Sequence, residues 1–143
     1  MTSPYVLLIE DNEDDIELTR RAFARNHIVN DLVVARDGVE ASDLLFGGEP
    51  DKLLPQFILL DLKLPRVSGL ELLERIRGDA RTALIPTVIL TSSKQDEDLL
   101  AGYHLGANSY VRKPVDFNEF VEAVRQVGLY WLVLNQPPPV DKT

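Results

Sequence analysis

Phe57-Ile58-Leu59-Leu60-Asp61 is a run of four apolar residues that ends in an aspartate. The run is continuous rather than alternating, which suits a strand buried on both faces of a parallel sheet. Four more short apolar runs of this kind occur along the chain, at Tyr5–Ile9, Leu32–Ala35, Thr87–Leu90 and Ser109–Val111. We therefore predict five strands over these ranges.

Helical signals separate the apolar runs. One apolar stripe with helical spacing is formed by Phe117, Phe120, Val121, Val124 and Val127. Three pairs of a cap residue and a glutamate three positions later predict helix starts: Asp37 with Glu40, Ser68 with Glu71, and Asp116 with Glu119. Three glycines stand where helices are expected to end: Gly78, Gly106 and Gly128. The alternation of strands and helices predicts an α/β fold with a doubly wound parallel sheet.

The composition limits both the size of the protein and the classes of partner. A chain of 143 residues is predicted to form one domain, and a net charge of −8 argues against nucleic-acid binding. The chain contains no cysteine, which excludes disulfides and thiolate sites. The N-terminal apolar run is too short for a membrane span or a signal segment, so we expect a cytoplasmic protein without membrane contact. His27 and His104 have no partner at metal-ligand spacing and are expected at the surface.

Polar residues follow the predicted strands and are expected to meet at one edge of the sheet. The first run leads into Glu10 and Asp11, the third into Asp61, the fourth into Thr91, and the fifth, after Arg112, into Lys113. Ligands of doubly wound sheets bind at the carboxyl ends of the strands, beside the point where strand order reverses. Each residue alone is more typical of a cap, a turn or a solvated surface, and only their coincidence predicts a site.

The chemistry of these residues favours phosphoryl transfer with a metal ion. Carboxylates in a small space repel one another unless a cation lies among them, and oxygen ligands favour Mg²⁺. A carboxylate can attack phosphorus to form an aspartyl phosphate, whose formation a metal ion and a lysine assist. Asp61 is the predicted nucleophile because it stands alone after the central strand, with Glu10 and Asp11 beside it for the metal.

The sequence resembles the receiver domains of bacterial response regulators over nearly its whole length. The matching segments are Val6-Leu7-Leu8-Ile9-Glu10-Asp11-Asn12, Leu60-Asp61-Leu62-Lys63-Leu64-Pro65 with Gly69, Leu90-Thr91-Ser92, and Lys113-Pro114. The resemblance implies a flavodoxin-like five-stranded sheet with strand order 2-1-3-4-5. Within the family, the chain is similar to single-domain regulators that pair with bacterial phytochrome kinases. That similarity rests on Glu10-Asp11-Asn12 with Asp14, the loop Gly47–Pro55 and the extended C-terminal segment.

The resemblance also implies a role for each site residue. Asp61 would accept the phosphoryl group from a phosphohistidine of a sensor histidine kinase. Asp11, Asp61 and the backbone carbonyl of Lys63 would bind Mg²⁺, with Glu10 contributing directly or through water. The family most often has two aspartates after the first strand, so Glu10 is a departure from its pattern.

The remaining implied roles concern the phosphoryl group and the switch. Lys113 would pair with the phosphoryl group and Thr91 would hydrogen-bond to it, so that Asp61, Thr91 and Lys113 form the reactive set. Tyr110 would move inward with Thr91, although a half-buried strand aromatic is the alternative for this residue. Lys113-Pro114 would be a cis peptide.

Three alternative functions are compatible with parts of this pattern. A magnesium-dependent phosphohydrolase of the haloacid dehalogenase type would use similar groups, but it places a second aspartate where this chain has Lys63. A flavin-binding domain would need a phosphate cradle after the first strand, and Glu10 to Asp15 would repel a phosphate. A receiver-like module that is never phosphorylated would not require Asp11, Asp61, Thr91 and Lys113 together.

The C-terminal segment is the last feature with a predicted role. We expect residues 1–128 to form the receiver domain, and residues 129–143 to form a helix end and an extended tail. Leu129 to Leu134 is more apolar than a helix end on a monomer should be, which favours a homodimer contact. We expect no output domain after the receiver, and we therefore expect the signal to leave through binding of a partner. The expected binding surface lies near the fourth and fifth strands.

Overall fold

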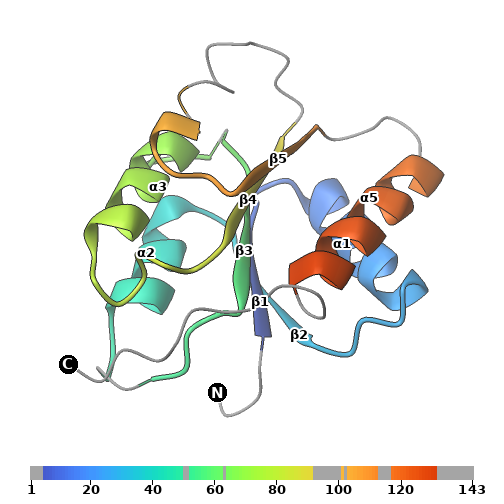
Figure 1. Cartoon of the computed structure of the whole chain (residues 1–143), viewed down its shortest axis with the longest axis horizontal. Helices are drawn as coiled ribbons and strands as arrows, with labels where there is room; N and C mark the ends of the chain where they lie inside the picture. The colour runs from blue at the N-terminus through green and yellow to red at the C-terminus, as the bar shows by residue number, and fades with distance from the viewer. Residues whose placement is uncertain are drawn as a thin grey trace.

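The structure is a computed structural model in which residues 5–49, 52–62, 64–91, 101, 103–112 and 117–131 are described, with the backbone alone at 91 and 109–112. Strands and helices alternate along the chain as predicted as far as β4, and the segment between β4 and β5, where a further helix is expected, lies mostly outside the described residues (Figure 1). Their bounds are β1 (Tyr5–Ile9), α1 (Glu13–Arg25), β2 (Asp31–Ala35), α2 (Gly38–Phe46), β3 (Phe57–Leu60), α3 (Gly69–Gly78), β4 (Thr87–Thr91), β5 (Ser109–Arg112) and α5 (Phe117–Leu129). All five predicted strands are present; β2 begins one residue earlier than predicted, and β4 and β5 end one residue later.

The five strands form one parallel sheet in the order β2-β1-β3-β4-β5, which is the order implied by the family resemblance. The chain runs from β1 outward to β2, then returns to the other side of β1 and continues through β3 to β5. Strand order therefore reverses between β1 and β3. The carboxyl ends of these two strands flank the crevice where ligands of such sheets bind.

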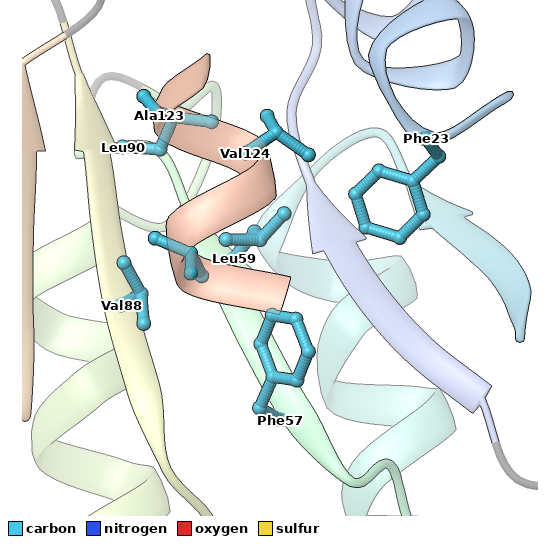
Figure 2. A pocket seen from close by; sticks show the side chains of 8 residues that line it. Phe23, Phe57, Leu59, Val88, Leu90, Ala123 and Val124 are labelled. Carbon is cyan, nitrogen blue, oxygen red and sulfur yellow. The ribbon is translucent and has the colours of Figure 1, made fainter. Parts of the chain in front are cut away.

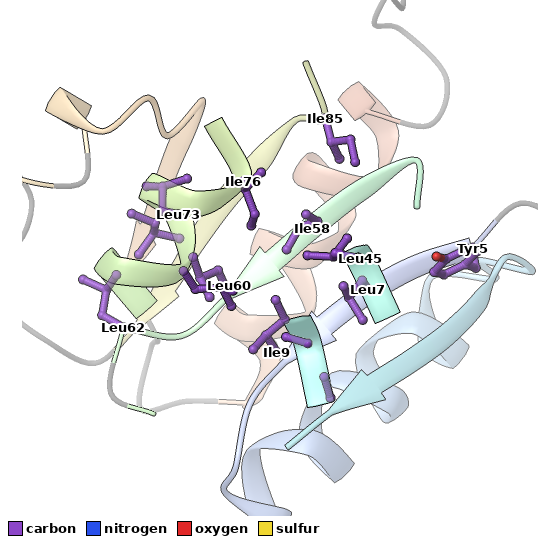
Figure 3. Packing of buried hydrophobic residues seen from close by; sticks show 14 residues of the cluster. Tyr5, Leu7, Ile9, Leu45, Ile58, Leu60, Leu62, Leu73, Ile76 and Ile85 are labelled. Carbon is purple, nitrogen blue, oxygen red and sulfur yellow. The ribbon is translucent and has the colours of Figure 1, made fainter. Parts of the chain in front are cut away.

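Two hydrophobic layers cover the two faces of the sheet. Side chains alternate between these layers along β1 to β4: Leu7 and Ile9 of β1 belong to one cluster, and Val6 and Leu8 to the other. Figure 3 shows the first cluster, between the sheet and the helices α2 and α3. The second cluster includes residues of α1 and α5. Burial on both faces explains why β1 and β3 are continuously apolar in sequence.

The predicted helix starts agree with the capping hydrogen bonds. The Asp37 side chain accepts a hydrogen bond from the backbone N–H of Glu40, and the Ser68 hydroxyl accepts one from that of Glu71. The helix α5 begins at Phe117 with Glu119 in its first turn, while Asp116, the predicted cap, lies outside the described residues.

The predicted helix ends are correct at two of the three glycines. Gly78 is the last residue of α3, and Gly106 adopts a φ of +95° where a helical turn leads into β5. The prediction for Gly128 is wrong, because α5 continues to Leu129 with Gly128 buried inside it. A Cβ on Gly128 would lie 2.9 Å from Cδ1 of Ile28. Close packing against the Ile28 side chain in the α1–β2 loop therefore favours a small residue at this position, and Gly128 does not end the helix.

None of the helices in the described ranges is long and apolar enough to cross a membrane. The predicted extended tail at residues 136–140 lies outside those ranges.

Candidate functional site

Three carboxylates meet at the carboxyl ends of β1 and β3. One carboxylate oxygen from each of Glu10, Asp11 and Asp61 can be chosen so that all three lie within 4.8 Å of one another. Glu10 and Asp61 are buried, with 2% and 7% of their surface exposed, whereas Asp11 is exposed. The sequence predicted this grouping, and the structure brings all three residues together.

Backbone hydrogen bonds continue the sheet by one residue beyond its strands and thereby fix the trio. The N–H of Glu10 donates to the carbonyl of Ala35 at 2.9 Å, and the N–H of Asp61 donates to the carbonyl of Ile9 at 3.0 Å. Glu10 and Asp61 thus belong to adjacent strands in fixed register. A parallel register places both side chains at the same edge of the sheet.

The turn after Asp61 is held tightly against the end of β3. The N–H of Gly69 donates to the carbonyl of Leu62 at 3.0 Å. A Cβ on Gly69 would lie 2.5 Å from the carbonyl oxygen of Asp61 and 2.6 Å from Cα of Leu62. Only a glycine at the start of α3 allows this approach, so α3 begins in direct contact with the backbone of Asp61.

Two ion pairs link the segment that follows β2 to the start of α1 and to the turn after β3, and sequence reasoning missed both. Arg36, which follows β2, pairs with Glu13 at the start of α1. Arg66 in the turn after β3 lies 3.9 Å from a carboxylate oxygen of Asp37. Both pairs join loops that are distant in sequence, and no spacing rule within one element could have indicated them. Arg36 and Glu13 are 43% and 70% exposed, so their pair contributes little to stability, whereas in the second pair Arg66 is 67% exposed and Asp37 only 17%.

The donor set of the trio fits a hard divalent cation. All three groups are carboxylates, and two of them are buried, where repulsion between negative charges is poorly screened by water. A divalent ion among them would relieve that repulsion, and Mg²⁺ commonly takes one or two carboxylates together with phosphate oxygens and waters. The arrangement therefore suits Mg²⁺ and a phosphoryl group at the same place.

The remaining predicted site residues are only partly described. Thr91 is the last residue of β4, which pairs with β3, and Tyr110 lies in β5 opposite Ile89 of β4. The backbone therefore places Thr91 at the same edge of the sheet as Asp61, while the side chains of Thr91 and Tyr110 are not described. Lys63, Lys113 and the predicted cis peptide Lys113-Pro114 lie outside the described residues.

A separate cavity in the hydrophobic core has no groups for chemistry. It lies between the sheet, α1 and α5, and eight apolar residues line it, among them Phe23, Phe57 and Val124 (Figure 2). Its volume of about 10 Å³ is close to the minimum for one water molecule, and an apolar wall offers that water no hydrogen bonds. We interpret it as a packing defect.

His27 and His104 are exposed, as predicted.

Comparison with known proteins gives consistent matches over most of the chain. The family model described as the response regulator receiver domain matches residues 6–125. The probable methanogenesis regulatory protein FilR2 of Methanothrix harundinacea is 40% identical over 134 residues, which cover 93% of this chain and 86% of that protein.

Two crystal structures of similar proteins cover nearly the whole chain. The phosphorylated cyanobacterial phytochrome response regulator RcpA has a TM-score of 0.88 and 31% identity, covering 96% of this chain and 100% of RcpA. The Mn²⁺-bound form of response regulator Rcp1 has a TM-score of 0.84 and 31% identity, covering 95% of this chain and 100% of Rcp1.

Proposed function

Because this chain belongs to the response regulator receiver domain family, we propose that Asp61 accepts a phosphoryl group in a reaction that depends on Mg²⁺. The observation that supports the proposal is the acidic trio of Glu10, Asp11 and Asp61 at the point where strand order reverses. Asp61 is the proposed acceptor because it follows β3, the central strand, and its surroundings are mostly protein rather than water.

Family membership confirms the resemblance drawn from the motifs, and the chain is a signalling protein of the response regulator type. The comparisons do not support the phosphohydrolase alternative. We propose that the chain also assists its own phosphorylation and dephosphorylation.

We assign the proposed roles residue by residue. Asp11, Asp61 and the backbone carbonyl of Lys63 would hold Mg²⁺, with Glu10 acting directly or through water. A structural neighbour, Rcp1, has been crystallised in a Mn²⁺-bound form, which supports a divalent ion here. Bound Mg²⁺ would supply positive charge to the oxygens of the phosphoryl group in transfer. Lys113 and Thr91 would contact the transferred group, and Tyr110 would follow Thr91.

The proposed step is a direct displacement at phosphorus. A carboxylate oxygen of Asp61 forms the new bond to phosphorus, while the bond from phosphorus to the imidazole nitrogen of a phosphohistidine breaks. The electron pair of that bond remains on the imidazole, which takes up a proton. The products are an aspartyl phosphate on this chain and a neutral histidine on the kinase.

Mass spectrometry tests this proposal. The protein is mixed with acetyl phosphate and Mg²⁺, and we expect one phosphoryl group per chain, located on Asp61. Asp61→Asn should abolish the modification, and Asp11→Asn should reduce it strongly. Asp14→Asn, a charge removal at an exposed position in the first turn of α1, should leave it unchanged. Modification that is absent, or that occurs at another residue, would sink the proposal.

We propose that the physiological phosphodonor is a sensor histidine kinase of the bacterial phytochrome class. The likeness to the phytochrome response regulator RcpA supports this choice. Phosphotransfer from a purified phytochrome kinase should be faster than from an unrelated histidine kinase at equal concentration. Equal rates of phosphotransfer from the two kinases would contradict the phytochrome kinase as the donor, but they would not affect the proposal that Asp61 is the acceptor.

We further propose that the chain consists of a receiver domain and a short C-terminal segment and that it is located in the cytoplasm. Residues 1–128 would be the receiver and residues 129–143 a helix end and tail in a cytoplasmic protein that binds no nucleic acid. Leu129 and Tyr130 are 42% and 48% exposed at the end of α5, which supports a homodimer contact there. Sedimentation that gives a monomer at every concentration would contradict the dimer.

The output is proposed to be a binding surface near β4 and β5 that phosphorylation changes. Phosphorylation would shift the population between two conformations of this surface, and a partner would bind one of them better.

A further inference from the structure

The helix α3 touches the candidate phosphoacceptor site at one end and the start of β5 at the other. Its first residue, Gly69, packs against the backbone of Asp61 and Leu62. Near its last turn, Arg77 reaches across to the segment that leads into β5. In Figure 1 this segment, drawn in orange, runs beside α3.

Arg77 uses all three of its side-chain nitrogens in this contact. Nε donates to the carbonyl of Gly106 at 2.9 Å, Nη1 to the carbonyl of Ile85 at 2.9 Å, and Nη2 to Oδ1 of Asn108 at 2.8 Å. Partial burial lowers the pKa of the Arg77 guanidinium below its usual range, because desolvation disfavours the charged form. The three hydrogen bonds compensate this cost, and each involves a charged donor, which strengthens it.

Asn108 extends the contact into the sheet. Its Oδ1 also accepts a hydrogen bond from the N–H of Thr87 at 2.8 Å, and its own N–H donates to the carbonyl of Thr87 at 2.9 Å. Thr87 is the fully buried first residue of β4. Arg77 and Asn108 together therefore fix the starts of β4 and β5 to the end of α3, and we call this pair the Arg77–Asn108 clamp.

The backbone conformation of Gly106 and its lack of a side chain allow Arg77 to approach closely. Its φ of +95° lies in the left-handed region that favours glycine, and a Cβ there would lie 3.0 Å from Nε of Arg77. Leu105 and Ala107 on either side pack against the core cluster that contains Leu72, Leu73 and Ile76 of α3. The segment that leads into β5 is thus held to α3 by both polar and apolar contacts.

A helix held at both ends moves as a unit, because its backbone hydrogen bonds resist stretching and its core face is closely packed. A displacement of Gly69 when the group on Asp61 changes would therefore reach Gly106 and Asn108 through Arg77. Helix shifts of this kind are a known form of switching in proteins.

We infer that Arg77 is a positioning residue that couples the state of Asp61 to the start of β5, through α3 and Asn108. The inference rests on the proposed function, since it assumes that Asp61 binds a phosphoryl group. It adds a second connection between the site and β5, separate from the one proposed through Thr91 and Tyr110.

The test uses beryllium trifluoride with Mg²⁺ as a mimic of the phosphoryl group on the full chain. Fluorine NMR reports whether the mimic binds, and hydrogen exchange of a peptide spanning residues 103–112 reports the response. We expect the wild type to bind the mimic and to change its exchange in this peptide. Arg77→Met should bind the mimic with affinity within about threefold of the wild type, because Arg77 is not proposed to contact it. In this variant, the change in hydrogen exchange at residues 103–112 on binding of the mimic should be less than half of the change in the wild type.

Matched variants separate coupling from a general loss of stability. Arg81→Met removes another arginine contact near the end of α3, but one that reaches the carbonyl of Phe46 in α2, and it should respond like the wild type. Asn108→Asp keeps an acceptor for both Arg77 and Thr87 and should also respond like the wild type. Arg77→Lys keeps the positive charge, but an ammonium group cannot donate in the directions of the three guanidinium nitrogens, so the change in hydrogen exchange should be smaller than in the wild type. It replaces Arg77→Met in the test if that variant does not fold.

Failure of the proposed function and failure of the coupling through Arg77 give different results in this test. A wild type that does not bind the mimic overturns the proposed function. A wild type that binds it without any change at residues 103–112, or an Arg77 variant that binds it with the full change, overturns the coupling through Arg77 alone.

Discussion

Gly69 shows how a single residue sets the geometry of the candidate site. It lies eight positions after Asp61 in sequence, and the turn between them folds back so that the two backbones touch. Any side chain at this position would meet backbone atoms, which cannot rotate away as the end of a flexible side chain can. The position of Asp61 therefore depends on a residue that has no functional group of its own.

We predict that Gly69→Ala destabilises the protein by about 1–3 kcal/mol, as overpacking of a closely packed site does. It should also weaken Mg²⁺ binding, because the strand end that carries Asp61 must move. Urea unfolding and a Mg²⁺ titration measure the two effects.

Gly78→Ala is the matched control in the same helix. A Cβ there would have no atom within 4 Å, so the substitution should be neutral or stabilise α3 by at most about 1 kcal/mol. Equal behaviour of the two variants would show that the approach of Gly69 to Asp61 is not required.

At the scale of elements, α1 and α5 are joined by two polar contacts over an apolar interface. Nδ2 of Asn26, at the end of α1, donates to the carbonyl of Ala22 and to that of Val121 in α5, both at 2.9 Å. About one turn earlier in both helices, the guanidinium of Arg21 lies 4.9 Å from the ring centre of Phe117, the first residue of α5. These contacts fix how the two helices lie across the same face of the sheet.

We predict that Asn26→Ala lowers the free energy of unfolding by about 0.5–1.5 kcal/mol, because a partly buried hydrogen bond between α1 and α5 is lost. Asn30→Ala removes an exposed hydrogen bond to the Gln56 side chain in the neighbouring loop, and its effect should stay within about 0.5 kcal/mol. Chemical denaturation of both variants provides the comparison. A cost for Asn26→Ala no larger than that for Asn30→Ala would mean that this bond does not hold α1 to α5.

At the scale of the whole molecule, the chain carries a net charge of −8 and gathers part of that charge at one edge of its sheet. Folding brings Glu10, Asp11 and Asp61 together, whereas the unfolded chain keeps Asp61 far from the other two. A cation that binds the trio therefore binds the folded state in preference to the unfolded one, and stabilises it.

We predict that Mg²⁺ at about 100 times its dissociation constant raises the free energy of unfolding by about 2.7 kcal/mol. For a chain of this length, the midpoint of thermal unfolding should rise by roughly 5–10 °C. Calorimetry with and without Mg²⁺ measures the change. Asp61→Asn should lose most of it, whereas Asp14→Asn should retain it. A rise of the same size in Asp61→Asn would place the ion elsewhere.

The strands, most helix ends and the acidic trio could be predicted from the amino-acid sequence alone. The apolar runs define the strands, and the caps Asp37 and Ser68 define two helix starts, because a buried strand and a helix cap each require particular residues within a few positions. Once alternating elements imply a parallel sheet, residues after the strands must meet at one edge. Glu10, Asp11 and Asp61 could therefore be grouped without coordinates.

The contacts that depend on how elements approach one another could be identified only in the folded chain. Gly128 looked like a helix end in sequence, but it makes room for Ile28, which lies 100 positions away. The pairing of Glu13 with Arg36, the bond from Asn26 to Val121 and the Arg77–Asn108 clamp likewise join residues from different elements. Such contacts depend on the distance and the rotation between packed elements. Periodicity and capping act over only a few residues, so they do not predict how two distant elements are placed relative to each other.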